Sequence, residues 1–168
     1  MDSDLFNKIT DDINIETVVD CYNMLQKNLQ TIEHKLSNFG VHTWRAISQM
    51  LLSDDFIRKF QDKVDWGIIS DGFPLTENFI EEFQDKINWD LVSKSQNLSE
   101  DFIKQYQDKL DKKWISRYQV LSEDFIREFQ DKVNWEWISK YQRVSEAFIC
   151  EFQNRMDWDA ISKYQESL

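Results

Sequence analysis

Apolar residues in the line LSEDFIREFQDKVNWEWISKYQ, residues 121–142, follow the 3.6-residue period of amphipathic helices. The period restarts at Asn134, so the line predicts two short helices. The first has an apolar face made by Phe125, Ile126, Phe129 and Val133. Ser122 and Asn134 stand at predicted helix N-caps, because their side chains can accept a free backbone N–H. Lys132 is expected in the last turn of the first helix, where the dipole favours a cation.

The same line recurs with a period of 23 residues and no insertion, and it predicts units at 52–74, 75–97, 98–120, 121–143 and 144–168. A phenylalanine column marks their equivalent positions: Phe56, Phe79, Phe102, Phe125 and Phe148. Upstream, Trp44 to Ser48 matches the end of a unit one residue out of phase, which predicts a partial unit at 44–51. Because such short helix pairs cannot bury their apolar faces alone, they are expected to stack. We therefore predict an all-α fold, an αα solenoid of five 23-residue two-helix repeats over residues 44–168.

Two polar columns accompany the apolar one. The serine column is Ser70, Ser93, Ser116, Ser139 and Ser162. We expect it at helix crossings, each hydroxyl bonding a carbonyl one turn back, rather than as a row of nucleophiles. The glutamine column is Gln61, Gln84, Gln107, Gln130 and Gln153, and its amides are expected to bridge adjacent units. In the third unit Lys112 replaces the tryptophan of the other units, and Trp114 follows two residues later, which predicts local repacking or a different surface.

Residues 1–43 lie outside the repeats and carry a heptad pattern. Its apolar positions are Ile15, Val18, Tyr22, Leu25, Leu29, Ile32 and Leu36, spaced three and four residues apart. That spacing predicts a helix with a coiled-coil seam. Two roles remain open for it: pairing with a second copy in a homodimer, or folding back to cover the end of the solenoid.

Composition narrows the class of protein. Only 3 glycines and 1 proline in 168 residues favour helices over turn-rich strands. The net charge of −11 argues against direct binding of nucleic acid or anionic lipid. Two cysteines, no basic and apolar leader, and no apolar run of about 18 residues indicate a soluble cytoplasmic protein without a membrane span.

The sequence contains few residues arranged for catalysis or metal binding. It therefore predicts a protein that is not an enzyme and that has no metal and no cofactor. His34 is expected on the polar side of the heptad helix and His42 in a loop, and neither has a nearby nucleophile or carboxylate partner. The cysteines and histidines lack metal-ligand spacing, and no phosphate-binding glycine motif occurs. Much of the charge is expected in helical i, i+4 pairs: Glu82–Lys86, Glu128–Lys132 and Glu151–Arg155.

Stacking turns repeated positions into two surface stripes. The acidic stripe comprises Asp55, Asp62, Glu82, Asp85, Asp101, Asp108, Asp124, Asp131 and Glu151. It either imitates a phosphate backbone for a basic protein partner or is a solvated face neutralised by neighbouring lysines. The basic–aromatic stripe comprises Lys94, Arg117, Tyr118, Lys140, Tyr141, Lys163 and Tyr164. Such residues can stack with and neutralise single-stranded nucleic acid, or serve as helix-end cations and half-buried tyrosines.

The repeat line over residues 44–166 resembles short helical repeats in proteins of giant DNA viruses, phages and some bacteria. The resemblance implies an αα solenoid and a viral or mobile-element origin, hence the cytoplasm of a host cell, and supplies no catalytic residues. We expect a non-catalytic protein-binding repeat protein. Its sharper form is an anti-CRISPR-like inhibitor of a host nucleic-acid-handling defence protein. The alternatives are a scaffold or adaptor without inhibitory activity and a single-stranded nucleic-acid binder.

Overall fold

The computed structural model describes residues 40–50 and 52–164, and the heptad pattern of residues 15–36, with His34 and Cys21, lies outside them. The chain divides into two compact units, which comprise residues 1–69 and residues 70–168. The described part of the first unit contains helices α4 (Val41–Ser48) and α5 (Asp54–Lys59) and the start of α6 (Trp66–Gly72). His42, which the sequence analysis places in a loop, is an exposed residue of α4. The chain has no glycine or proline between His42 and Gly67, so no helix-breaking residue interrupts α4 before its end at Ser48.

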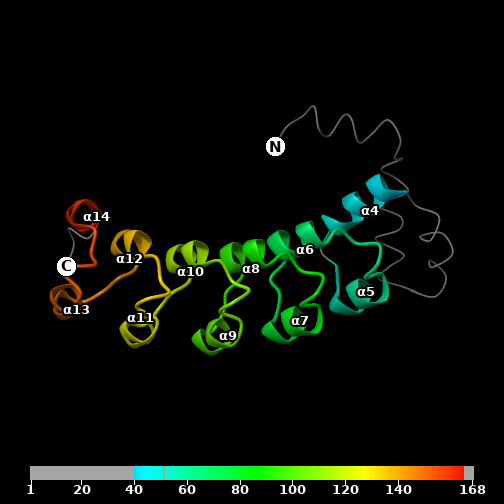
Figure 1. The fold of residues 1–168 in the computed structure, drawn as a ribbon. Helices are drawn as coiled ribbons and strands as arrows, with labels where there is room; N and C mark the ends of the chain where they lie inside the picture. Colours follow the sequence, from blue (N-terminus) through cyan, green and yellow to red (C-terminus); the bar gives the residue numbers. More distant parts are fainter. Residues whose placement is uncertain (1–39, 51, 165–168) are drawn as a thin grey trace. The chain divides into compact units, whose positions relative to one another are not determined.

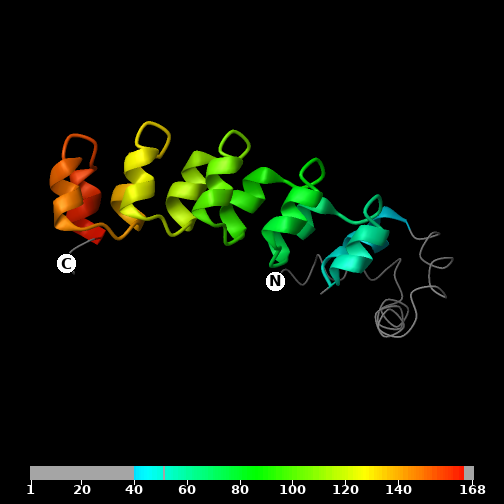
Figure 2. The same ribbon diagram turned by 90° about the horizontal axis from the view of Figure 1, so that it is seen from below.

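The second unit continues from Ser70 with four pairs of helices. Their first helices are α7 (Glu77–Glu82), α9 (Glu100–Gln105), α11 (Glu123–Glu128) and α13 (Glu146–Glu151). Their second helices are α8 (Trp89–Ser95), α10 (Lys112–Tyr118), α12 (Trp135–Tyr141) and α14 (Trp158–Tyr164). Within this unit the first helices form one row and the second helices another, as Figures 1 and 2 show. The described residues contain helices and no strand, which confirms the predicted all-α repeat fold.

The predicted caps set the starts of the helices within the repeats. Ser122 accepts from the backbone N–H of Phe125 at 3.1 Å, and Asn134 accepts from that of Trp137 at 3.1 Å. Equivalent bonds begin α5, α7, α9 and α13. The first helices end sooner than predicted: α11 stops at Glu128, so Lys132 lies beyond it in a turn. There Lys132 donates its backbone N–H to Phe129 in an i, i+3 bond, which tightens the chain out of the α-helix.

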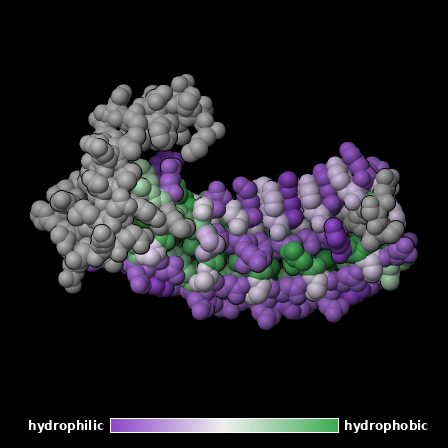
Figure 3. All heavy atoms as spheres, turned by 180° about the vertical axis from the view of Figure 1, so that it is seen from behind, coloured by the Kyte–Doolittle hydropathy of each residue, from purple (hydrophilic) through white to green (hydrophobic). Residues whose placement is uncertain are grey.

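The apolar core lies between the two rows of helices in the second unit, where Figure 3 shows hydrophobic atoms as a band between hydrophilic rims. Every member of the phenylalanine column is at most 4% exposed, so the five equivalent positions share one environment. Each second helix also packs against the second helix of the next pair, from α8 to α14. This arrangement confirms that each pair covers its neighbour's apolar face.

The serine column joins neighbouring repeats through its hydroxyls. Ser116 is fully buried, donates to the carbonyl of Lys112 at 2.7 Å and accepts from the backbone N–H of Asn134 at 2.9 Å. The bond one turn back confirms the prediction, and the bond to the next cap residue adds a contact that the sequence did not indicate. Ser48 makes the same two bonds, to Trp44 and from Asp65, which places α4 as the end of a partial repeat.

A different glutamine column from the predicted one holds the repeats together. Gln96, Gln119 and Gln142 are at most 6% exposed, and each amide bonds two carbonyls of the preceding repeat and one N–H of its own. The predicted column lies nearer the surface. Gln84 and Gln107 do bridge repeats there, because their side-chain oxygens accept from Lys109 and Lys132.

Glutamates at the start of the first helices form a third connection. Glu77, Glu100 and Glu123 each accept the backbone N–H of the next repeat's cap serine at 2.6 Å. The pKa of Glu123 is lowered from its ordinary value of 4.5, first by the bond from the backbone N–H of Ser145. The bond from the Ser145 hydroxyl and the charge of Arg127 lower it further. The carboxylate of Glu123 therefore stabilises the fold above its ordinary pKa, and this contribution is lost as the pH falls through the lowered value.

A pH titration of stability tests this connection. The Glu123→Gln variant is expected to be less stable than the parent by about 1 kcal/mol at pH 6, because a charged acceptor becomes neutral at a partly exposed site. The difference should shrink as both proteins are taken toward pH 3, where the parent's carboxylate is protonated. Urea unfolding followed by circular dichroism at each pH measures it. A difference that stays constant over this range would contradict the assignment.

Candidate partner-binding surfaces

The two rows of helices in the second unit differ in charge. Helices α7, α9, α11 and α13 contain ten acidic and two basic residues. Helices α8, α10, α12 and α14 contain three acidic and six basic residues. The net charge of the whole chain therefore conceals a basic row lying beside an acidic one.

All nine members of the predicted acidic stripe are exposed. Several of them face cations at close range: Asp55 pairs with Arg58, Asp124 with Arg127, and Asp131 with Arg155, at 3.2, 2.9 and 2.8 Å. Glu151 also pairs with Arg127, at 2.9 Å. These contacts support the neutralised-face alternative along this part of the stripe.

The ion pairs differ from two of the predicted ones. Glu128 pairs with Lys104 of the preceding repeat at 2.6 Å rather than with Lys132, and this contact raises the pKa of Lys104. Glu151 and Arg155 likewise pair across repeats, with Arg127 and Asp131. The predictions for Glu128–Lys132 and Glu151–Arg155 are wrong because the first helices end before the fourth following residue, which removes the helical i, i+4 geometry.

The basic row carries a surface that we call the cation–aromatic ladder. It consists of Trp114, Arg117 and Tyr118 on α10, Trp137, Lys140 and Tyr141 on α12, and Lys163 and Tyr164 on α14. Tyr118, Tyr141 and Tyr164 are 43%, 40% and 49% exposed, so their rings are half in solvent. The ladder includes every member of the predicted basic–aromatic stripe except Lys94, which is exposed on α8 and contacts no ring of the described residues.

Rings and cations alternate along the ladder. The guanidinium carbon of Arg117 lies 4.8 Å from the ring centre of Tyr118 and 4.5 and 4.8 Å from those of Trp137 and Tyr141 in the next repeat. The ammonium of Lys140 lies 5.3 Å from the ring of Tyr141 and 4.9 Å from that of Tyr164. Such distances are those of cation–π contacts, which orient each cation between two repeats.

Contacts within the ladder shift the pKa values of two of its side chains, Lys140 and Tyr164. A hydrogen bond with Lys163, followed by the charge of Lys140, lowers the pKa of Tyr164. The hydrogen bond with Tyr141 raises the pKa of Lys140. Among the described residues, no carboxylate lies within ion-pair distance of the three ladder cations, Arg117, Lys140 and Lys163.

Sequence reasoning missed the two tryptophans of the ladder. Trp114 lies 5.7 Å from Tyr118 and 6.0 Å from Trp137, and Trp137 lies 5.4 Å from Tyr141. Each tryptophan precedes its tyrosine by four residues, so the shared spacing Trp-x-x-(Arg or Lys)-Tyr is a signal that could have found them.

Comparison of the chain with protein-family models, with curated proteins and with solved structures found no match. No helix within residues 40–50 and 52–164 has the length and hydropathy needed to cross a bilayer. The same residues contain no group of three or more His, Cys, Asp or Glu arranged to hold a metal ion.

Proposed function

We propose that this protein is a non-catalytic repeat protein that binds another protein. The cation–aromatic ladder is the contact surface, and an extended acidic segment of the partner is what it contacts. The observation that carries this proposal is the different environment of cations in the two rows. Arg127 and Lys104 of the acidic row are paired with carboxylates, whereas Arg117, Lys140 and Lys163 of the ladder have aromatic neighbours and retain their capacity to bind anions.

The composition of the ladder supports a protein partner. Tyrosine, tryptophan and arginine are the residue types that contribute most binding energy at protein interfaces, because they bury large areas at a low entropic cost. The rings are already ordered by their contacts with one another and with the cations. A partner therefore meets a preorganised surface, which reduces the cost of association.

The faces of the rings argue for carboxylates rather than nucleobases. Single-stranded nucleic acid would need free ring faces for stacking. Arg117 already lies against three rings, and Lys140 lies against two. The groups left to a partner are the outer N–H groups of the cations and the tyrosine hydroxyls, which donate hydrogen bonds to carboxylates.

Spacing along the ladder favours an extended segment that runs across the second helices. Neighbouring packed helices are about 8–10 Å apart. A polyproline II chain rises about 3.1 Å per residue, so every third side chain advances by about 9 Å. A segment with an acidic residue at every third position can therefore place one carboxylate at each repeat.

A labelled peptide with the sequence (Glu-Pro-Pro)4 tests this proposal directly. Fluorescence anisotropy with the full chain at low salt is expected to show binding that weakens as salt is added, because the contacts are exposed charges. The double variant Arg117→Gln/Lys140→Gln should weaken binding about tenfold or more, since each lost cation contributes up to about 1 kcal/mol.

Matched controls separate the ladder from general charge effects. The double variant Arg45→Gln/Lys63→Gln removes the same two kinds of charge at exposed sites outside the ladder, so it should leave binding within about twofold. The peptide (Gln-Pro-Pro)4 should not bind. If the acidic peptide does not bind, or if an oligothymidylate binds through the same residues more tightly, the proposal is overturned.

The charge of the acidic row supports a second candidate function, binding of a basic partner such as a nucleic-acid-handling defence protein of a host cell. Ten carboxylates against two cations in the first helices of the second unit are the supporting observation. An anti-CRISPR-like inhibitor of this kind should block DNA cleavage by a basic RNA-guided nuclease at low salt, and added nucleic acid should relieve the block. The charge-reversed variant Asp101→Lys/Asp108→Lys should lose the inhibition.

A further inference from the structure

A column of tryptophans fills equivalent places between successive repeats. The ring of Trp89 lies 6.5 and 5.2 Å from the ring centres of Phe102 and Tyr106 in the next repeat. Trp135 lies likewise 6.4 and 5.0 Å from Phe148 and Phe152. Each indole therefore has the same seat, formed by two aromatic rings of the following first helix and its turn.

Two polar contacts accompany each of these indoles. The indole N–H of Trp89 donates to the carbonyl of Gln84 at 3.0 Å, and that of Trp135 donates to the carbonyl of Gln130 at 2.8 Å. A cation of the next repeat covers the ring: the ammonium of Lys109 is 5.1 Å from Trp89, and the guanidinium carbon of Arg155 is 5.7 Å from Trp135. The seat thus has a stacking wall, an acceptor for the N–H and a covering cation.

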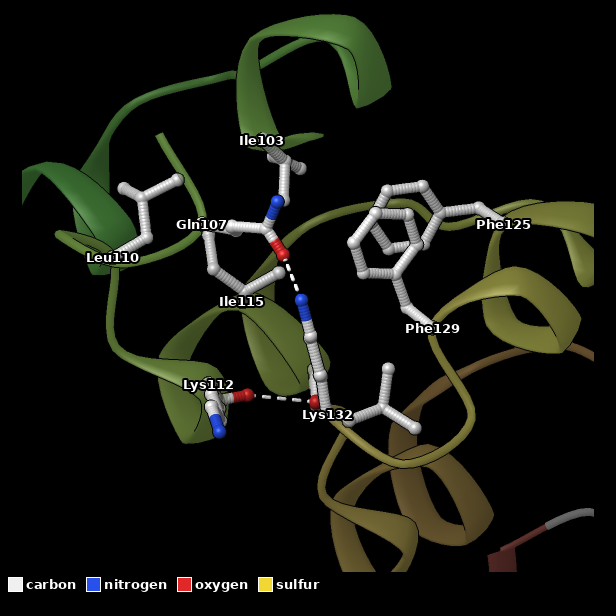
Figure 4. Close-up of a pocket in the computed structure, with 10 residues that line it drawn as sticks. Ile103, Gln107, Leu110, Lys112, Ile115, Phe125, Phe129 and Lys132 are labelled. Atoms are coloured by element: carbon white, nitrogen blue, oxygen red, sulfur yellow. Dashed lines mark hydrogen bonds between the residues drawn. The ribbon is translucent and has the colours of Figure 1, made fainter. Parts of the chain in front are cut away.

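The third repeat keeps this seat but has Lys112 in place of the tryptophan. A small cavity of about 40 Å³ lies there and opens to solvent, so a ring bound in it stays partly exposed, as Trp89 and Trp135 are in their own repeats. We call it the indole slot and define it by its lining residues: Ile103, Gln107, Leu110, Lys112, Ile115, Ser116, Phe125, Phe129, Lys132 and Val133. Figure 4 shows the two phenylalanine rings on one side of the slot and the side chain of Lys132 running along it toward Gln107.

Every element of the seat has a counterpart in the indole slot. Phe125 and Phe129 form the wall, with ring centres 4.6 Å apart and planes inclined by 11°. Gln107 supplies the carbonyl equivalent to those of Gln84 and Gln130, and no described residue donates to it. Lys132 occupies the position of Lys109: its ammonium donates to the side chain of Gln107 and lies 5.6 Å from the ring of Phe129.

The chain does not fill the slot from its own third repeat. Trp114, two residues beyond the substituted position, points instead into the cation–aromatic ladder, where it contacts Tyr118 and Trp137. Lys112 itself is exposed, as its charge requires. An apolar site with one convergent acceptor and one convergent cation is the usual form of a small-molecule site.

From this correspondence we infer that the indole slot binds a planar aromatic ring of the indole class, whose N–H donates to the carbonyl of Gln107. The ligand ring lies against Phe125 and Phe129, and the ammonium of Lys132 covers its outer face. The indole slot is separate from the ladder, and the tryptophans of the other repeats of the same chain serve as the template for its ligand.

Titration of indole into the isotopically labelled full chain tests the inference. Nuclear magnetic resonance is expected to show saturable shifts at the slot methyl groups of Ile103, Ile115 and Val133. Replacing indole by 1-methylindole removes the N–H, and affinity should fall about fivefold, as for the loss of one hydrogen bond. Benzene should also bind less tightly. Equal affinity for all three compounds would overturn the assignment of Gln107 as the acceptor.

Three variants connect binding to the slot. Lys112→Trp restores the column, so it should abolish indole binding while raising the thermal unfolding midpoint. Lys113→Trp adds the same residue at the neighbouring exposed position and should leave binding within twofold. Phe129→Leu, which removes one ring of the wall, should weaken binding about fivefold. Indole shifts that persist unchanged in Lys112→Trp, or an absence of shifts in the parent protein, would overturn the inference.

A second ligand in the same titration distinguishes a free small molecule from a tryptophan side chain of a peptide. N-Acetyltryptophanamide carries the indole on a peptide-like backbone, whereas indole itself is a free small molecule. Comparable binding of both supports a tryptophan side chain of a peptide as an occupant, because the mouth of the slot then admits the attached chain. Binding of indole alone supports a free small molecule. Failure of both compounds to bind overturns the site without affecting the acidic-peptide experiment on the ladder.

Discussion

Replacing Gln119 with leucine is expected to lower the free energy of unfolding by about 3–5 kcal/mol, although the substitution keeps the size of the side chain and adds apolar surface. Gln119 is 3% exposed. Its amide N–H groups donate to the carbonyls of Ser93 and Gln96 at 3.2 and 2.7 Å, and its oxygen accepts from the backbone N–H of Leu98 at 3.0 Å. Leucine would leave all three backbone groups buried without this partner, at about 1–3 kcal/mol each before relaxation.

Urea unfolding of the full chain, followed by circular dichroism, measures this loss. Hydrogen exchange of the Leu98 amide should accelerate at the same time, which ties the effect to the bond rather than to general loosening. Gln130→Leu is the matched control, because the side chain of Gln130 is partly exposed and makes no such bonds; it should change stability by less than about 0.5 kcal/mol. Similar losses in the two variants would refute a special role for the buried glutamines.

The second large effect is expected at the serine column. Ser116→Val should reduce stability by about 3–5 kcal/mol, and Ser116→Ala by about 1–3 kcal/mol. Alanine removes the hydroxyl that accepts from the backbone N–H of Asn134 and donates to the carbonyl of Lys112. Valine removes the same bonds and also forces two methyl groups into a crossing where Ser116 is fully buried, so the helices must separate.

Equilibrium denaturation of both variants distinguishes the two contributions. Ser162→Ala serves as the control, since Ser162 is exposed and its one bond among the described residues is to the carbonyl of Trp158 one turn back. Its stability should stay within about 0.5 kcal/mol of the parent. If Ser116→Val proved no worse than Ser116→Ala, close packing at this crossing would not be the reason for the small side chain.

Local signals in the sequence were sufficient to predict the helices and their starts. Ser122 and Asn134 cap α11 and α12 as expected, because a cap depends on a side chain and a backbone group only three residues away. The ends of the first helices were predicted less well. The turn at Lys132 has no glycine or proline to mark it, and backbone bonds from Lys132 and Val133 to the carbonyl of Phe129 close it.

The candidate surfaces were predicted in part for the same reason. The tyrosines and cations of the ladder were identified because they recur at one position in three repeats, as Tyr118, Tyr141 and Tyr164 illustrate. Trp114 was noted only as a departure from the repeat, and its role in the ladder depends on contacts with Trp137 in another repeat. Cavities are likewise absent from a sequence pattern, so the substitution at Lys112 indicated a change without indicating the slot it leaves.

The sequence by itself determined the repeat, the helix pairs, their caps and the burial of the phenylalanine column, since each follows from spacing within 23 residues. Only the tertiary structure decided which polar side chains connect the repeats. Gln107 and Gln119 are the same residue type in the same unit, yet the first lies at the surface and the second bonds three backbone groups of the core. A hydrogen bond between residues more than 20 positions apart depends on how two repeats meet, and that meeting is set by the packing of their shared apolar faces.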